Sequence, residues 1–337
     1  MENKIGDPKV SIVTPSYNQG HFIEKTIISV LGQDYPNLEY IVLDSASNDR
    51  TGEVLDKYSS YIDIVIREKD KGQADAINRG FQLSSGEILA YLNSDDCYAN
   101  QSVVSTVVKH LQADPEIDVI YGQRQFIDED GYFRFCYPIR PFCEKNLYLS
   151  CYMHQESTFW RRSIYEKAGG FVDESYQFAM DYELWMRFLK FGAKVSGFDD
   201  VFGLFRYYDN QKSTAQWQQV GLPEIERVYR QYSDRCLPEK EMIDCHQEYF
   251  FGANPSKNPD SYRFAYDLWA SFVAYKKNLL KQPIDTWGFN ADLSHRKLRW
   301  WCRWRAVEPL VGKCATHKWL YSLSFSVNGA SAALAAP

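Results

Sequence analysis

The stretch of sequence that decides the fold reads Glu87-Ile88-Leu89-Ala90-Tyr91-Leu92-Asn93-Ser94-Asp95-Asp96. Its first six residues are mainly apolar and follow a turn signal at residues 84–86, so they predict a short buried strand. The carboxylates of Asp95 and Asp96 then stand where this strand leaves its sheet. Such a pair suits a hard divalent cation, which proteins bind through one or two carboxylates together with substrate phosphates. A solvated turn or a helix cap is the alternative interpretation of the same two residues.

Three apolar runs precede this strand, at residues 9–14, 39–43 and 62–66, and each predicts a strand of its own. Apolar residues recur at helical spacing over residues 23–31, and a second helix is expected from about Thr51. Strands that alternate with helices indicate βαβ units and a mostly parallel sheet.

Polar residues stand at the ends of three of these predicted strands. They are residues 14–17, Asp44, and the pair Asp95 and Asp96. In open α/β sheets, ligands bind in the crevice beyond the carboxyl ends of the strands. The sequence therefore predicts a nucleotide site at this edge of the sheet.

An ordered series of motifs carries a resemblance to a known family. Its members are Thr14-Pro15-Ser16-Tyr17-Asn18, then Asp44 with Ser47 and Asp49, then residues 72–80, then Asn93-Ser94-Asp95-Asp96. This series resembles the inverting glycosyltransferases of family 2, which have the GT-A fold. The resemblance covers roughly residues 8–215 and continues at residues 154–162, 169–174 and 180–187. The last of these segments resembles the motif that carries the catalytic base.

The resemblance implies an α/β fold of GT-A type, in which helices flank a mostly parallel sheet. Beyond residue 215 the alternation of strands and helices fades, and residues 223–232, 237–250 and 262–280 predict helices. We therefore expect a catalytic domain at residues 1–215 and a mainly helical C-terminal extension at residues 216–337.

The same resemblance implies a set of residues that bind the nucleotide-sugar donor. They are Thr14, Pro15, Tyr17, Asp44, Gly72, Gln73, Asp75, Asn93 and Asp95. In this set Tyr17 stacks on the base, Asp44 accepts a base N–H, and Gly72 permits close approach of the backbone to the ligand. Turn packing for Tyr17, helix capping for Asp44 and a place in the first turn of a helix for Asp75 are the structural alternatives.

Loss of a nucleoside diphosphate develops negative charge, which a divalent cation, Mn²⁺ or Mg²⁺, neutralises. The resemblance implies that Asp95 is the principal ligand and that Asp96 is a supporting ligand. Family members often carry an acidic residue at the position of Asn93, so the amide at this position is a departure from the pattern.

An inverting transfer also needs a base that takes the proton from the acceptor hydroxyl. The resemblance implies that Asp181 is this base, ahead of an amphipathic helix at residues 182–191. The family usually has an acidic pair here, and Met180 replaces its first member. Capping of the helix is the alternative role of Asp181. The sequence does not assign the roles of His154 and Glu183.

Composition limits the range of functions. The net charge of -6 and the pI near 5.6 argue against nucleic-acid binding. The eight cysteines form no CxxC pairs, which argues against a zinc site or a disulfide framework. The N-terminus shows no secretory signal and no apolar run is long enough to span a bilayer, so a cytoplasmic location with reduced thiols is expected.

Residues 295–305 are basic and aromatic within this acidic chain, and two interpretations stay open. In the first, they form an interfacial helix on an anionic membrane surface, at the inner face of the membrane. In the second, they form a terminal helix whose tryptophans pack on the catalytic domain.

The leading hypothesis is an inverting, metal-dependent glycosyltransferase. It would move a sugar from a nucleotide sugar, taken to be a UDP-sugar, to a hydroxyl of a surface polysaccharide or lipid-linked glycan. One alternative is a catalytically inactive binding module of a glycan-assembly complex. Another is a sugar nucleotidyltransferase, against which the absence of a Gly-rich basic loop after the first strand argues.

Overall fold

The computed structural model describes residues 6–136, 142–144, 147, 151–208 and 211–232. Its strands are β1 (Val10–Ser16), β2 (Leu38–Asp44), β3 (Ile64–Arg67), β4 (Ile88–Tyr91), β5 (Cys97–Tyr98), β6 (Val119–Ile127), β7 (Phe133–Cys136), β8 (Thr158–Arg161) and β9 (Val195–Arg206). Its α-helices are α1 (Ile23–Leu31), α2 (Thr51–Tyr58), α3 (Gln73–Leu83), α4 (Val103–Ala113), α6 (Arg162–Lys167), α7 (Met180–Lys190), α8 (Lys212–Ala215) and α9 (Leu222–Gln231). Short helical turns η1 (Ser59–Tyr61), η2 (Gln155–Ser157) and η3 (Trp217–Gly221) complete the described elements.

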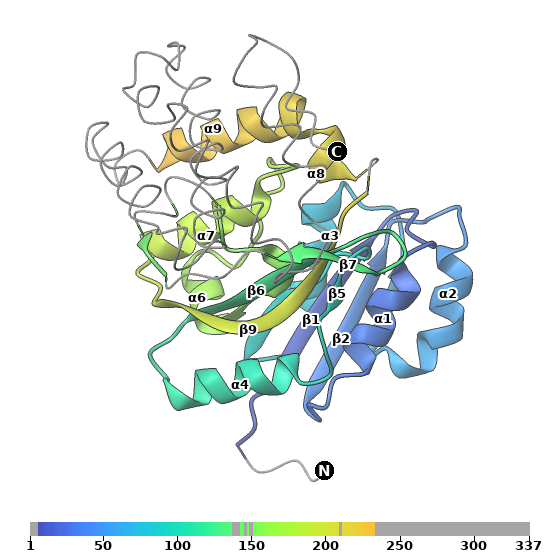
Figure 1. The fold of residues 1–337 in the computed structure, drawn as a ribbon, viewed down its shortest axis with the longest axis horizontal. Helices are drawn as coiled ribbons and strands as arrows, with labels where there is room; N and C mark the ends of the chain where they lie inside the picture. The colour runs from blue at the N-terminus through green and yellow to red at the C-terminus, as the bar shows by residue number, and fades with distance from the viewer. Residues whose placement is uncertain (1–5, 137–141, 145–146, 148–150, 209–210, 233–337) are drawn as a thin grey trace, which may run out of the picture.

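Within the described residues, nine strands form one sheet in the order β3-β2-β1-β4-β8-β6-β9-β5, with β7 paired to β6 (Figure 1). β1 pairs in parallel with β2 and with β4, and β2 pairs in parallel with β3, as the sequence predicts. β8 runs antiparallel to both β4 and β6, whereas β6 and β9 are parallel. The expected α/β fold is thus confirmed, but the sheet is mixed instead of mostly parallel, because the strands after β4 pair mainly in antiparallel fashion.

The parallel strands end at one edge of the sheet. Ser16 at the end of β1 is in register with Asp44 at the end of β2, and Asp44 is in register with Arg67 at the end of β3. β4 ends beside them at Tyr91, so residues 93–96 emerge at the same edge. The geometry of the sheet therefore brings together polar segments that are far apart in the sequence.

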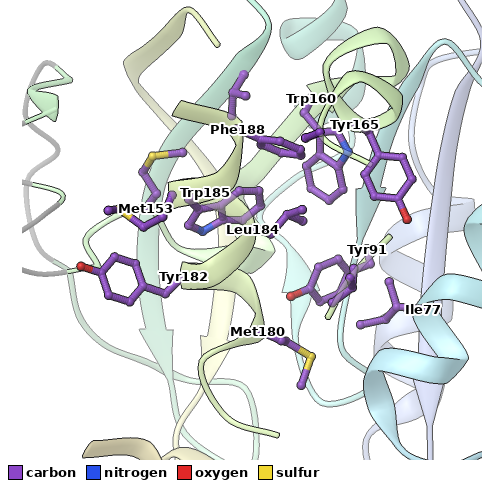
Figure 2. Packing of buried hydrophobic residues seen from close by; sticks show 14 of the residues in the cluster. Ile77, Tyr91, Met153, Trp160, Tyr165, Met180, Tyr182, Leu184, Trp185 and Phe188 are labelled. Atoms are coloured by element: carbon purple, nitrogen blue, oxygen red, sulfur yellow. The ribbon is translucent and has the colours of Figure 1, made fainter. Parts of the chain in front are cut away.

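The core lies on both faces of the sheet, because successive side chains of a strand point to opposite faces. In β1, Val13 belongs to a cluster with residues of α3, α6 and α7, while Ile12 belongs to a cluster with residues of α1 and α4. Figure 2 shows the first cluster, in which Trp160 of β8 meets Trp185 of α7 at a centroid distance of 5.3 Å. Helix α7 is thus anchored in the core through its apolar side.

Helix α7 begins two residues earlier than the sequence predicts. It starts at Met180 instead of Tyr182, and both of these side chains are buried in the core cluster of Figure 2. Asp181 consequently lies in the first turn of the helix, and the N-cap position belongs to Ala179, which has no side chain that could cap. The predicted helix at residues 223–232 is confirmed as α9.

Several predictions concern residues outside the described ranges. The helices expected at 237–250 and 262–280 and the basic aromatic segment at 295–305 all lie there. The division of the chain at residue 215 stays a prediction. Among the described residues, no helix combines the length and the apolar character needed to cross a bilayer.

The contact between α3 and the sheet gives a test of the core. A methyl group added at Gly80 would lie against Val13 Cγ1 and within 2.9 Å of Leu43 Cδ1. We expect Gly80→Ala to lower the free energy of unfolding by about 1–3 kcal/mol, as overpacking does. Urea denaturation measures the change.

The matched control is Gly52→Ala in α2, where the added methyl group would have no atom within 4 Å. This variant should be neutral or more stable by up to about 1 kcal/mol, since it loses less chain entropy on folding. Equal effects of the two substitutions would contradict the described packing of α3.

Candidate functional site

The loops after β1 and β2 are bound to each other at the common edge. The buried Asp44 carboxylate accepts hydrogen bonds from the hydroxyl and the main-chain N–H of Ser47, at 2.5 and 3.0 Å. The Ser47 hydroxyl oxygen in turn accepts from the N–H of Asn18 at 2.7 Å. Asn18 and Ala46 both have positive φ, 52° and 50°, which strains each loop locally. The two loops therefore hold each other in defined conformations.

The predicted base-binding residues differ in exposure. Thr14 is buried and accepts a hydrogen bond from the Tyr40 hydroxyl at 3.1 Å, and Pro15 is buried beside it. Tyr17 is 62% exposed, so its ring is open to a flat partner. Asp44 spends part of its acceptor capacity on Ser47, but a carboxylate has about four acceptor positions. Tyr17 and Asp44 are thus the members of this group that a base could reach.

The loop before α3 has a conformation that only glycine adopts easily. Gly72 has φ 133°, and its N–H donates to the carboxylate of Asp70 at 2.9 Å. Asp75, in the first turn of α3, accepts from the main-chain N–H of Lys71 at 3.0 Å. Asp75 therefore lies in the first turn of a helix, where its alternative interpretation puts it, and its role toward the donor stays a prediction.

Three side chains link the start of α3 to the end of β4 and to α8. The Gln73 amide donates to Asn93 Oδ1 at 2.7 Å, and Lys212 Nζ donates to Gln73 Oε1 at 2.9 Å. Burial lowers the pKa of Lys212, an effect that nearby Glu224, Asp181 and Asp95 oppose. The Lys212 ammonium is thus near both the candidate metal ligand Asp95 and the candidate base Asp181.

Asp95 and Asp96 point in different directions. Asp96 is buried, and its carboxylate accepts from the main-chain N–H of Arg206 at 2.9 Å. Asp95 is partly exposed and accepts from the Tyr208 hydroxyl at 2.9 Å. Burial raises the pKa of both groups, and for Asp96 the neighbouring Asp95 and Glu156 carboxylates raise it further.

These residues fit a divalent cation. The Asp95 carboxylate is partly exposed and open to a cation, and the buried Asp96 carboxylate follows it in the chain. Among the described residues, no group of three or more His, Cys, Asp or Glu side chains could hold a metal ion. A cation at Asp95 would therefore take other ligands from donor phosphates and water, as Mg²⁺ commonly does.

Arg206, at the end of β9, fixes the segment that carries both aspartates. Its guanidinium is buried and donates to the main-chain oxygen of Asp95 at 2.8 Å. It also donates to the main-chain oxygens of Asp128 and Glu129, at 2.9 and 2.8 Å. One side chain thereby joins the loop after β4 to the turn between β6 and β7.

The candidate base, Asp181, lies in a setting that favours its neutral form. Burial raises the pKa of its carboxyl to about 6, although the main-chain N–H of Tyr182 donates to it at 2.8 Å. Arg124 opposes the rise and Glu156 adds to it. An acid with a pKa near neutrality can accept and release a proton under ordinary conditions.

Arg124 and Glu156 form a two-point ion pair beneath the site. Their paired N–O distances are 2.5 and 2.6 Å, and the guanidinium stacks 4.0 Å from the Phe205 ring centroid. Burial acts to raise the pKa of Glu156, but Arg124 outweighs it and the pKa is lowered. Burial and Arg124 lower the pKa of His154 to about 3, so its imidazole is neutral at physiological pH.

Sequence reasoning missed Arg124, Glu156, Arg206, Tyr208 and Lys212. One signal was available for the first, since an arginine within the otherwise uncharged strand at residues 119–127 indicates a buried ion pair. Arg206 ends a mainly apolar run in the same way. Tyr208 and Lys212 carry no such signal, because their partners are brought to them only by the folded chain.

The comparisons with known proteins agree with this geometry. Residues 11–175 match the model of glycosyl transferase family 2. The chain carries a family 2 glycosyltransferase domain. The predicted family is thus confirmed, while the inverting mechanism, the metal dependence and the donor stay predictions.

Two relatives illustrate the range of the similarity. An uncharacterized glycosyltransferase of Rickettsia typhi is 28% identical over 250 residues, 72% of this chain and 77% of the relative. The UDP-Glc:alpha-D-GlcNAc-diphosphoundecaprenol beta-1,3-glucosyltransferase WfgD of Escherichia coli is 36% identical over 126 residues, 37% of this chain and 49% of the relative. The chain thus spans about half the length of WfgD.

Solved structures show the same fold. S. aureus TarS (residues 1–349), in complex with UDP-GlcNAc, has a TM-score of 0.57 at 16% identity, covering 79% of this chain and 81% of that one. The mannosyltransferase PcManGT from Pyrobaculum calidifontis, in complex with GDP-Man and Mn²⁺, has a TM-score of 0.53 at 18% identity, covering 90% and 85%. Both are GT-A type transferases, and the family 2 domain described here has this fold.

The pKa of Asp181 sets the expected pH dependence of transfer. A base must be ionised, so kcat/KM should fall as pH falls through about 6, by about tenfold per pH unit below it. Initial rates from pH 4.5 to 8.5 measure this limb, and donor binding over the same range separates it from titration of Asp95. An acid limb near pH 4, the ordinary value for Asp, would contradict the described environment.

The raised pKa of Asp181 makes folding stability fall as pH rises, whereas the rate of transfer is expected to increase. The folded-state pKa of Asp181 lies above the unfolded value, so ionisation costs folding free energy as pH rises from about 4 to about 6.

Proposed function

We propose that this protein is an inverting glycosyltransferase that uses a divalent cation and a nucleotide sugar to glycosylate a hydroxyl acceptor. The observation that carries the proposal is the pair of unlike carboxylates at one sheet edge. The Asp95 carboxylate is partly exposed and is bound by the Tyr208 hydroxyl, while burial raises the pKa of Asp181 to about 6. Separate environments for two carboxylates are a common way to divide two roles in one site.

In this proposal the donor lies across the ends of β1, β2 and β4. Tyr17 stacks on the base and Asp44 accepts one of its N–H groups. The backbone at Gly72 and the amides of Gln73 and Asn93 face the ribose and diphosphate. A divalent cation held by Asp95, with support from Asp96, would supply charge neutralisation for the diphosphate.

The transfer then takes place in one displacement. Asp181 removes the proton from the acceptor hydroxyl as its oxygen bonds to the anomeric carbon. The bond from that carbon to the phosphate oxygen breaks, and its electron pair leaves with the nucleoside diphosphate. Attack from the face opposite the leaving group inverts the anomeric carbon. The Lys212 ammonium, held by Gln73, is placed to stabilise the charge on the leaving diphosphate.

The names of the relatives support a proposal for the donor and acceptor classes. WfgD is named for a UDP-glucose donor and a lipid diphosphate acceptor, and TarS was solved with UDP-GlcNAc. We therefore propose a UDP-sugar as donor and a surface polysaccharide or lipid-linked glycan as acceptor. A thermal-shift screen of nucleotide sugars with Mn²⁺ or Mg²⁺ identifies the donor, because a ligand that binds the folded state raises its melting temperature.

Asp95→Asn tests the metal role. We expect loss of nearly all transfer and of the metal dependence of donor binding, since a charge is removed from a site that depends on a cation. Calorimetric titration of donor with Mn²⁺, Mg²⁺ or EDTA measures the binding. Asp56→Asn, at an exposed carboxylate paired with Arg67 on the surface, is the matched control. Full activity of the native enzyme in EDTA would falsify the metal assignment.

Asp181→Asn tests the base. We expect kcat to fall by about 10²- to 10⁴-fold with donor affinity unchanged, because the base contacts the acceptor and not the donor. Asp173→Asn is the matched control. The Asp173 carboxylate also accepts a main-chain N–H, that of Ser175, but it lies in the loop before α7. If donor affinity is lost together with turnover, Asp181 has a structural or donor-binding role instead.

A further inference from the structure

Helix α9 lies beside α7 (Figure 1) and contacts the chain that leads into it through Glu224, Arg227 and Gln231. Arg227 donates to the Ser175 hydroxyl at 3.0 Å and stacks 3.4 Å from the Tyr176 ring centroid. The Tyr176 hydroxyl donates to Gln231 at 2.8 Å. Further along, the Tyr232 hydroxyl donates to Glu183 at 2.7 Å. In the sequence, Asp181 lies between two of the contacted residues, Tyr176 and Glu183.

Glu224 makes the central contact of this interface. Its Oε1 accepts from the main-chain N–H of Gln177 at 2.8 Å. Its Oε2 accepts from the N–H of Phe178 at 2.7 Å and of Ala179 at 2.9 Å. Three consecutive N–H groups thus converge on one carboxylate, immediately before the first residue of α7.

Glu224 provides part of a helix cap, because it accepts from the N–H of the N-cap residue Ala179 and of the two residues before it. The first N–H groups of a helix have no partner within it, and a negative charge near them is favourable because of the helix dipole. Ala179 occupies the N-cap position of α7 and has no polar side chain. Glu224, from another helix, provides charge-assisted hydrogen bonds there, and such bonds are about twice as strong as neutral ones.

The consequence concerns Asp181, two residues beyond the last of these N–H groups. Its place in the first turn depends on α7 starting at Met180, and Glu224 holds that start. We propose that Glu224 is a positioning residue for the base Asp181, acting through the main chain of residues 177–179. Because Asp181 is the base only within the proposed function, this inference rests on that function.

The test compares Glu224→Ala with Glu224→Gln. Glu224→Ala should lower kcat on the order of 10- to 100-fold, as small misplacements of a reacting group do, with donor KM within about twofold of native. Glu224→Gln keeps an acceptor oxygen at the same place and should recover part of this loss. If the alanine variant fails to fold, Glu224→Gln provides the test alone, and the kcat of this variant should lie measurably below that of the native protein.

Glu226→Ala is the matched control. Glu226 lies on the same helix, and its carboxylate accepts from Arg230 at 3.0 Å without touching residues 177–179. Its kcat should stay within about twofold of native. Thermal unfolding of all variants shows whether any change in rate follows from loss of the fold.

A double-variant comparison separates positioning from a general structural role. If Glu224 acts through Asp181, adding Glu224→Ala (or Glu224→Gln) to Asp181→Asn should lower kcat no further, because the two residues act as a unit. Additive effects overturn the inference, as does native kcat in both Glu224 variants while Asp181→Asn is inactive. Native kcat in Asp181→Asn overturns the base assignment of the proposed function and this inference with it.

Discussion

The buried guanidinium of Arg206 holds the site segment in place, and much of the described geometry depends on it. It donates to main-chain oxygens of Asp95, Asp128 and Glu129 and packs 5.1 Å from the Phe22 ring centroid. A buried charge without partners is very costly, so these carbonyls and the nearby Asp96 carboxylate must stay where they are. Arg206 thus fixes the main chain at Asp95, while the Tyr208 hydroxyl binds the carboxylate of this residue.

The ionisable groups of the site differ in how far a charge of opposite sign compensates them. Asp95, Asp96, Glu156 and Asp181 supply negative charge, while Arg124, Arg206 and Lys212 supply positive charge. Arg124 is committed to Glu156 and Arg206 to main-chain oxygens, so neither fully compensates Asp95. The proposed division of roles, with a cation at Asp95 and a proton at Asp181, rests on this difference between the two carboxylates.

The sequence predicts the features that depend on local pattern. Strands β1 to β4 follow from apolar runs in the sequence. Because parallel strands end at one edge of a sheet, the sequence also predicts that Asp44 and Asp95 stand at that edge. The link from Lys212 to Gln73 spans 139 residues and that from Arg206 to Asp95 spans 111, and no local pattern reports such contacts. The start of α7 shows the same limit. Asp181 is a good N-cap by local rules, but the helix starts at Met180, directly after Ala179, whose N–H donates to Glu224, 45 residues away.

Tyr208 and residues 211–232 contact three separate parts of the candidate site. Tyr208 contacts Asp95, Lys212 contacts Gln73, and Glu224 contacts the entry to α7. The motifs that identify the family all precede this stretch, and the family model itself ends at residue 175. The contacts that hold the candidate site therefore extend beyond the part of the chain that the family model matches. A chimera that joins a foreign C-terminal part directly after β9 would keep each sequence motif and lose the contacts that orient them.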